Sequence, residues 1–147
     1  MMGQQIDTPV GTPAVRAEQP ATVLVCDDEL RLGMLTAELL DGLGYKGIAV
    51  GSGGDALRTI AEASPNIGLL LLDVNLARDD GGNPGVSAYE ILRQLSASKE
   101  SVPVVLISGQ PRQDAPRALT SHPNVVGYLE KPYAVEGLLN AVRAALA

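Results

Sequence analysis

The sequence predicts an α/β protein in which one doubly wound sheet of five parallel strands is covered by helices on both faces. Five short apolar runs alternate with stretches in which an apolar residue recurs every third or fourth position. The runs show little alternation of polar and apolar residues, which indicates strands buried on both faces. A strand followed by a helix, repeated along the chain, implies right-handed crossovers and therefore a parallel sheet.

The five predicted strands are short and almost wholly apolar. They are VLVC at 23–26, IAV at 48–50, IGLLLLDV at 67–74, VPVVLIS at 102–108 and VVGYLEK at 125–131. Strands of this composition need cover on both sides, so the segments between them are expected to supply two layers of helices.

The predicted helices share apolar positions at spacings of three or four residues, which place these side chains on one helix face. They are marked by Leu32, Leu35, Leu39 and Leu43; by Ala56, Leu57, Ile60 and Ala61; by Ala88, Ile91, Leu92 and Leu95; and by Val135, Leu138, Leu139, Val142 and Leu146. The stretch 112–122 gives the weakest helix prediction because Pro116 interrupts it.

Local signals predict where two of these helices begin and end. Gly44 follows the first helix and suits the C′ position, where glycine is common. Ser52, with Asp55 three residues later, resembles a capping box at the start of the second helix, which should end before Pro65.

Length and composition favour one folded domain. The chain has 147 residues, 46% of them hydrophobic, and no apolar run reaches the roughly 20 residues that a membrane-spanning helix needs. The N-terminus lacks the layout of a signal peptide, so we expect a soluble, cytoplasmic protein without membrane insertion. Residues 1–21 contain three prolines and no helical or alternating period, which predicts a flexible tail before a domain at 22–147.

Charge and cysteine content exclude some classes of protein. The formal net charge of −6 disfavours direct binding of nucleic acid, whose phosphates carry the same sign. A single cysteine, Cys26, excludes an intramolecular disulfide and is expected to be a core residue. His122 is also the only residue of its kind, so no Cys/His cluster exists for zinc.

Polar residues gather where the predicted strands end. In open α/β sheets, ligands bind outside the carboxyl ends of the strands. The residues at these ends are Asp27, Asp28 and Glu29 after the first strand, Gly51 and Ser52 after the second, Asp73 near the end of the third, Ser108 at the end of the fourth, and Lys131 after the fifth.

This set suits chemistry on a phosphoryl group. Three carboxylates, Asp27, Asp28 and Asp73, would carry an excess of negative charge that a hard divalent cation relieves, and oxygen ligands of this kind favour Mg²⁺. Asp73 stands alone at the centre of the sheet and is the natural nucleophile. The ammonium of Lys131 and the hydroxyl of Ser108 would then neutralise and bind the phosphoryl oxygens.

Four motifs resemble the successive motifs of response-regulator receiver domains, the CheY-like modules of two-component signalling. They are VLVCDDE, LLLLDVN, VVLISG and GYLEKPY, in that order and at similar spacing over about 22–147. The resemblance implies a flavodoxin-like fold with strand order 2-1-3-4-5. It also implies a single-domain receiver that takes a phosphoryl group from the phosphohistidine of a sensor histidine kinase or a histidine phosphotransfer protein.

The resemblance implies a role for each matching residue. Asp73 becomes the phosphoacceptor, while Asp28 binds Mg²⁺ directly and Asp27 binds it mainly through water. Asn75 would lend its backbone carbonyl to the metal, and Lys131 would pair with the aspartyl phosphate, held by a cis bond to Pro132.

Two further residues match the positions of the family's switch. Ser108 would turn its hydroxyl toward the phosphate, and Tyr128, three residues before Lys131, would then move its ring inward. The expected output is a changed protein contact from a stand-alone chain, as a monomer or a phosphorylation-dependent dimer. Slow autodephosphorylation would end the signal.

The chain departs from the family pattern after Asp73, where VNLARDDGGNPGVSAYE makes a longer, glycine-rich loop at 76–87. Asp79 and Asp80 in this loop are either further metal ligands or parts of a solvated turn, and the second interpretation is favoured.

Simpler interpretations and two other functions stay open from the residues alone. Acidic residues at 27–29 also suit a helix N-terminus, which explains Glu29 well. Ser108, Lys131 and Tyr128 would be a turn residue, a solvated lysine and a half-buried strand tyrosine, and His122 is expected to be a surface residue. The alternative functions are a haloacid-dehalogenase-type phosphatase, which usually carries Asp where this chain has Asn75, and a pseudo-receiver that binds a partner without chemistry.

Overall fold

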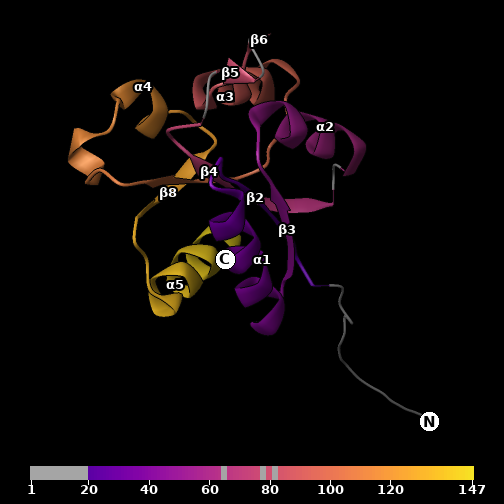
Figure 1. Ribbon diagram of the computed structural model, residues 1–147, viewed down its shortest axis with the longest axis vertical. Coiled ribbons are helices and arrows are strands. Elements are labelled where there is room, and N and C mark those ends of the chain that lie inside the picture. Colours follow the sequence, from indigo (N-terminus) through magenta and orange to yellow (C-terminus); the bar gives the residue numbers. More distant parts are fainter. Residues whose placement is uncertain (1–19, 64–65, 77–78, 81–82) are drawn as a thin grey trace.

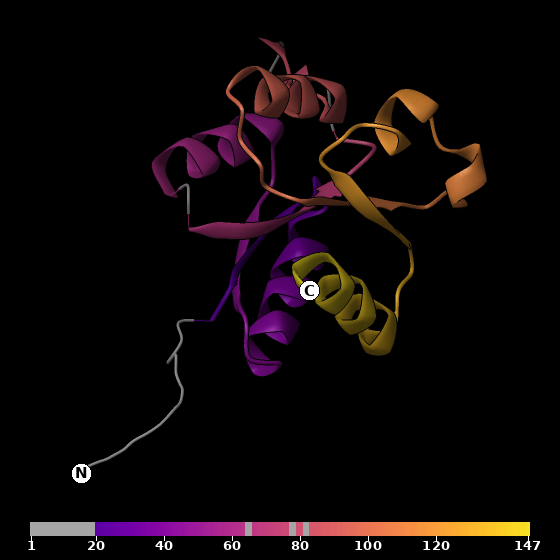
Figure 2. The same cartoon turned by 180° about the vertical axis from the view of Figure 1, so that it is seen from behind.

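The computed structural model describes residues 20–63, 66–76, 79–80 and 83–147. The predicted tail, 1–21, therefore lies almost wholly outside the described residues. Figure 1 shows the arrangement of the elements, and Figure 2 shows the same elements from behind.

One parallel sheet of five strands forms the centre of the domain. Its order is β3-β2-β4-β7-β8, which confirms the predicted order 2-1-3-4-5. The strands are β2 (Thr22–Cys26), β3 (Lys46–Val50), β4 (Ile67–Asp73), β7 (Val104–Ser108) and β8 (Val125–Glu130). Their ends differ from the predicted ends by at most two residues.

Helices cover both faces of this sheet, as predicted. Helices α1 (Leu30–Gly42) and α5 (Val135–Leu146) lie together on one face (Figures 1 and 2). Helices α2 (Gly53–Ala63), α3 (Ala88–Ala97) and the short α4 (Arg117–Thr120) lie on the other face. Among the described residues, no helix has both the length and the hydropathy required to cross a bilayer.

The strand side chains form two cores, one on each face. Leu24, Leu70 and Leu106 pack with α2 and α3 in one cluster. Val25 and Leu71, each one residue further along its strand, pack with α1 and α5 in the other cluster. All five are fully buried, and this explains why the strands show no polar alternation.

The glycine signal is realised in full, and of the predicted capping box the serine half is formed. Gly44 follows α1 with φ +97°, a left-handed conformation that favours glycine. The Ser52 hydroxyl accepts a hydrogen bond from the backbone N–H of Asp55 at 3.2 Å, which caps α2. The carboxylate of Asp55 pairs with Arg58 one turn later, at 2.7 Å.

The single helix expected over 112–122 is wrong, because Pro116 divides this stretch. A 3₁₀ turn, η1 (Arg112–Asp114), comes first, and α4 forms one turn beyond the proline. Ala115, the residue before Pro116, is extended with ψ 150°. Proline disfavours helical conformation in the residue before it, so the first turn ends before Pro116 and a new helical turn starts after it.

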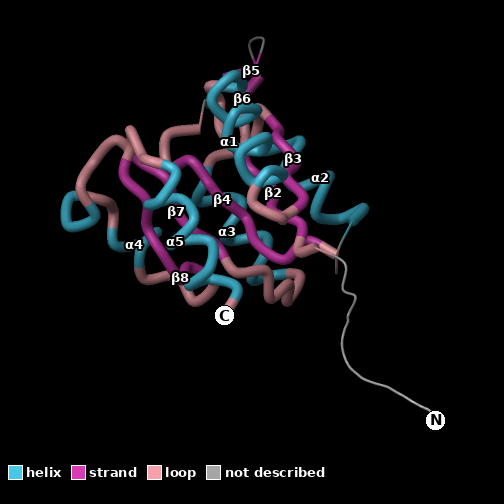
Figure 3. The backbone as a smooth tube through the Cα atoms, turned by 90° about the horizontal axis from the view of Figure 1, so that it is seen from below, coloured by secondary structure: helices cyan, strands magenta, loops and turns pink. Residues whose placement is uncertain are grey.

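The long connection between β4 and α3 carries a short antiparallel hairpin, β5 (Asp79–Asp80) with β6 (Asn83–Pro84). Figure 3 shows this hairpin at the periphery of the domain. The side chains of Asp79 and Asp80 lie outside what the structure describes, so their predicted role as metal ligands or turn residues stays a prediction.

Candidate functional site

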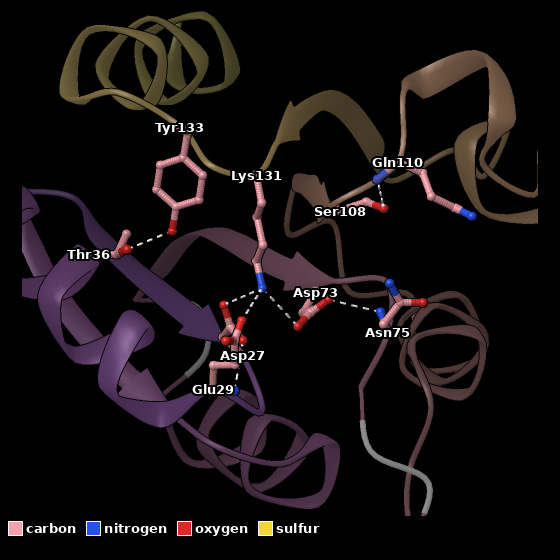
Figure 4. A network of polar contacts seen from close by, with 9 residues as sticks. All are labelled: Asp27, Glu29, Thr36, Asp73, Asn75, Ser108, Gln110, Lys131 and Tyr133. Carbon is pink, nitrogen blue, oxygen red and sulfur yellow. Dashed lines mark hydrogen bonds and ion pairs between the residues drawn. The ribbon is translucent and has the colours of Figure 1, made fainter.

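Four strands deliver polar side chains to one edge of the sheet. Asp73 and Ser108 are the last residues of β4 and β7, and Asp27 and Lys131 directly follow β2 and β8. Figure 4 shows Lys131 reaching down between the acidic residues. The prediction that these distant segments meet is confirmed by the contacts between them.

Asp27 is completely buried at the start of the turn into α1. Its Oδ1 accepts a hydrogen bond from the backbone N–H of Glu29 at 2.9 Å. Its Oδ2 lies 3.0 Å from the Lys131 ammonium and has no well-oriented hydrogen bond among the described residues. This buried oxygen is compensated by the Lys131 ion pair and can accept a further ligand.

Lys131 is the cation of the site. Its Nζ lies 3.0 Å from Asp27, 3.2 Å from Glu29 and 3.3 Å from Asp73. Partial burial by itself would lower the pKa of Lys131, but the three carboxylates outweigh burial and hold the pKa above its ordinary value. The side chain is only 17% exposed, which excludes the interpretation of a solvated lysine.

Asp73 occupies the centre of the site and is 3% exposed. Its Oδ1 accepts a hydrogen bond from the backbone N–H of Asn75 at 2.9 Å. Burial raises the pKa of Asp73 to about 6, and neighbouring Asp27 acts in the same direction against the Asn75 and Lys131 contacts. One ammonium therefore does not fully compensate the buried carboxylates.

The acidic residues fit a divalent cation. Carboxylate oxygens of Asp27, Asp28 and Asp73 lie within 4.8 Å of one another, with Asp28 exposed to solvent. An all-oxygen set that includes a buried atom able to accept a further ligand suits a hard cation such as Mg²⁺, which retains water ligands on its open side. The predicted role of the Asn75 carbonyl stays a prediction, since the contact that the structure shows is made by its N–H.

Ser108 and Tyr128 are linked through one residue that the sequence did not single out. Ser108 is fully buried, and its hydroxyl accepts a hydrogen bond from the backbone N–H of Gln110 at 3.0 Å. The phenol of Tyr128 donates to the Gln110 carbonyl at 2.8 Å. The backbone N–H and carbonyl of Gln110 are therefore each bonded to one of the two predicted switch residues. In the sequence, only its position two residues after Ser108 pointed to Gln110.

Two other contacts were not predicted from the sequence. Glu29 was assigned to the helix N-terminus, but its carboxylate also pairs with Lys131. Thr36 of α1 and Tyr133 share a hydrogen bond of 2.7 Å between their hydroxyl groups (Figure 4). No sequence signal predicted this bond, because neither Thr36 nor Tyr133 lies at the end of a predicted strand, where distant residues are expected to meet.

Cys26 and His122 do not belong to the site formed by the aspartates and Lys131. Cys26 is fully buried, as expected of a core residue, and burial together with the nearby carboxylates raises its pKa to about 12. His122 is partly exposed, as expected of a surface residue, but its ring also makes two hydrogen-bonding contacts. Its Nδ1 accepts the backbone N–H of Asn124 at 3.1 Å, and its Nε2 lies 2.9 Å from the Ser96 hydroxyl, so the ring bridges two segments.

Comparison with models of protein families matches residues 23–143 to the response regulator receiver domain. The chain belongs to this family. It is therefore a receiver domain of the two-component type, and neither the phosphatase nor the pseudo-receiver alternative is favoured.

Several relatives are regulatory proteins. The chain is 30% identical over 134 residues to the regulatory protein VirG of Agrobacterium fabrum, covering 91% of this chain and 49% of VirG. It is 31% identical over 134 residues to the transcriptional regulatory protein PdtaR of Mycobacterium tuberculosis, covering 88% of this chain and 58% of PdtaR. The chain thus spans about half the length of such relatives.

Solved structures share the fold. A response regulator receiver domain protein from Clostridium thermocellum superposes with a TM-score of 0.71 at 24% identity, covering 86% of this chain and 94% of that one. The chemotaxis protein CheY4 of Vibrio cholerae gives 0.71 at 22% identity, covering 87% and 100%. At this identity the likeness concerns the fold of the receiver.

Proposed function

We propose that Asp73 is the phosphoacceptor of this receiver and that it takes its phosphoryl group from a phosphohistidine in a Mg²⁺-dependent reaction. The observation that carries the proposal is the burial of Asp73 beside Lys131 and two further aspartates. Its pKa of about 6 leaves the carboxylate mainly ionised at neutral pH and available to attack phosphorus. The new Asp73 oxygen–phosphorus bond forms as the phosphorus–nitrogen bond to the donor imidazole breaks.

The cation site consists of the carboxylates of Asp27, Asp28 and Asp73, joined by the Asn75 carbonyl. When bound there, Mg²⁺ supplies positive charge to the phosphoryl oxygens during transfer. Asp28 is solvent-exposed and suits direct coordination, whereas buried Asp27 already engages Glu29 and Lys131 and suits contact through water.

In this scheme Lys131 also binds the phosphoryl group on Asp73. Its ammonium pairs with the carboxylates of Asp27, Glu29 and Asp73, and a cation held by Asp27 and Asp73 would compete with it for these two carboxylates. The flexible side chain is then free to pair with the phosphoryl group on Asp73. The Ser108 hydroxyl would leave the Gln110 N–H and donate to the same phosphoryl group, which releases the contact that Gln110 shares with Tyr128.

The exposed surface of helix α1 suits the docking of a protein that donates the phosphoryl group. Its outward half exposes four large apolar side chains, between 40% and 58% exposed, and the helix begins beside the acidic cluster. They are Leu30, Met34, Leu35 and Leu39. A surface of this kind marks an interaction site and suits the helices of a histidine kinase or phosphotransfer protein.

We place the phosphoryl transfer in the cytoplasm. The output is a changed protein contact, made by a monomer or by a phosphorylation-dependent dimer.

Incubation with acetyl phosphate and Mg²⁺, followed by intact mass measurement, tests the assignment. We expect a gain of one phosphoryl group that is lost with EDTA and in Asp73→Asn. Asp114→Asn changes an exposed aspartate on η1 and is the matched control, which should be phosphorylated like the wild type. An adduct that persists in Asp73→Asn would contradict the proposal, as would multiple-turnover release of phosphate from small phosphomonoesters.

A further inference from the structure

The segment that carries Lys131 is attached to the domain at two points. On one side, the Lys131 N–H donates to the Ser108 carbonyl at 2.7 Å, which continues the pairing of β7 and β8. On the other side, three residues lead to α5, which begins at Val135. Pro132 has no N–H to donate and Ala134 has only a methyl side chain, and both are exposed. Tyr133 is therefore the side chain that can tie this segment to its surroundings.

Tyr133 reaches across to α1. Its phenol oxygen lies 2.7 Å from the Oγ1 of Thr36, which is 1% exposed on the inner face of the helix (Figure 4). The ring packs against the apolar cluster that joins α1, α5 and the sheet. Burial raises the pKa of Tyr133, so its hydroxyl keeps its proton at neutral pH.

The two ends of this hydrogen bond belong to opposite sides of the site. Thr36 lies on the helix that starts directly after Asp27, Asp28 and Glu29, and Tyr133 lies two residues after Lys131. The bond therefore links the helix that follows the acidic residues to the segment that carries Lys131. A pocket of about 340 Å³ lies between the same two elements and is lined by Glu29, Leu32, Lys131, Pro132 and Tyr133.

We propose that the Thr36–Tyr133 hydrogen bond is a positioning contact for phosphoryl transfer, because it holds the Lys131 segment at a set distance from the carboxylates. The proposal rests on the function proposed above for Asp73. In this scheme the Lys131 ammonium pairs with the carboxylates before transfer and with the phosphoryl group during transfer. Small displacements of a positioned group slow a reaction strongly, so a loosened segment should lower the rate of transfer. Thr36 and Tyr133 act through Lys131 and are positioning residues.

A positioning role for Thr36 and Tyr133 predicts that their substitution slows phosphorylation but leaves the affinity for Mg²⁺ nearly unchanged. The proposed Mg²⁺ ligands directly follow β2 or lie at and just after the end of β4, and the Tyr133 hydroxyl forms its hydrogen bond with Thr36, so Mg²⁺ affinity should stay within about twofold of the wild type. The phosphorylation rate should fall about two- to tenfold in Tyr133→Phe, the range expected for loss of one hydrogen bond. Thr36→Val, which keeps the shape but removes the hydroxyl, should slow the reaction similarly.

The experiment measures phosphorylation of the full chain by acetyl phosphate by intact mass over time, and Mg²⁺ binding by calorimetry. The variants are Tyr133→Phe, Thr36→Val, their combination, and Thr36→Ser. Tyr45→Phe is the matched control, since Tyr45 packs on the same cluster. We expect the double variant to be no slower than the slower single variant, Thr36→Ser to recover the wild-type rate within about twofold, and Tyr45→Phe to be unchanged.

The outcomes separate this inference from the proposed function. If the wild type gains no phosphoryl group, or if Asp73→Asn still gains one, the assignment of Asp73 and the inference both fail. If the wild type is phosphorylated on Asp73 but Tyr133→Phe reacts as fast as Tyr45→Phe, only the inference fails. Equal slowing by Thr36→Ser and Thr36→Val, or a Mg²⁺ affinity that falls in parallel with the rate, would likewise overturn a positioning role.

Discussion

Replacing the proposed phosphoacceptor should make the metal-free protein more stable at neutral pH. Asp73→Asn removes the charge but keeps the size of the side chain and an Oδ1 acceptor for the Asn75 N–H. The wild-type carboxylate is 3% exposed and is held beside buried Asp27. Loss of this charge should therefore remove a repulsion that the fold tolerates for its function.

The pKa of Asp73 sets the size and the sign of the effect. The pKa is raised by burial, and by Asp27, from 3.8 to about 6. At pH 3 and below, the carboxyl is largely protonated in both the folded and unfolded states, so it hardly affects the free energy of unfolding. Above pH 6 it is ionised in both, and a difference of roughly two pKa units destabilises the folded state by about 3 kcal/mol. The gain in Asp73→Asn should therefore be near zero at pH 3, about 0.5 kcal/mol at pH 4, and rise to at most about 3 kcal/mol by pH 7.5.

Urea or thermal unfolding in EDTA, followed by circular dichroism, measures this gain; the chain has no tryptophan to report by fluorescence. For a domain of this size, 3 kcal/mol corresponds to a rise in Tm of about 10 °C. Glu38→Gln is the matched control, because it removes one negative charge from the exposed side of α1 and should shift stability by less than about 0.5 kcal/mol at any pH. A variant no more stable than the wild type at pH 7.5, or a gain independent of pH, would refute the reasoning.

Three further predictions follow from packing and charge. Gly47→Ala should destabilise the fold by about 3 kcal/mol in urea unfolding, because its Cβ would lie 2.4 Å from the Ala37 carbonyl oxygen. Gly54→Ala, in a helix with open space around it, should be neutral or stabilising by up to about 1 kcal/mol. The Cys26 thiol should not react with a thiol reagent at pH 8 until the protein unfolds, since it is buried with a pKa of about 12. Lys131→Met should tighten Mg²⁺ binding about tenfold in calorimetry, because a competing positive charge is removed.

Each of these outcomes has a result that would contradict it. A Gly47→Ala protein as stable as Gly54→Ala would show that β3 and α1 do not approach so closely. Rapid labelling of Cys26 in the native state would mean that the first strand opens readily. Weaker Mg²⁺ binding in Lys131→Met would indicate that the ammonium organises the carboxylates for the metal instead of competing with it.

Much of the site could be predicted because parallel strands meet at their carboxyl ends. Asp27, Asp73, Ser108 and Lys131 each end or follow an apolar run, and a parallel sheet brings such positions to one edge whatever the sequence separation. The strand assignments were similarly secure, since continuous apolar runs between helical periods have few other arrangements. Two helical patterns were misleading. Over 112–122, the short-range effect of Pro116 outweighed the pattern, and in α1 the apolar positions Leu35 and Leu39 are exposed while Thr36 and Leu40 face the core.

The sequence by itself determined the order of elements, the two-sided burial of the strands and the edge at which the acidic residues gather, because these follow from local periodicity and from the handedness of the chain. Only the tertiary structure decided which hydroxyl meets which partner. The bond between Thr36 and Tyr133, the Gln110 contacts of Ser108 and Tyr128, and the pairing of Glu29 with Lys131 depend on side-chain directions and on distances of about 3 Å. Such contacts depend on how α1, the pair β7–β8 and the segment after β8 are placed relative to one another, and they leave no repeat or spacing in the sequence.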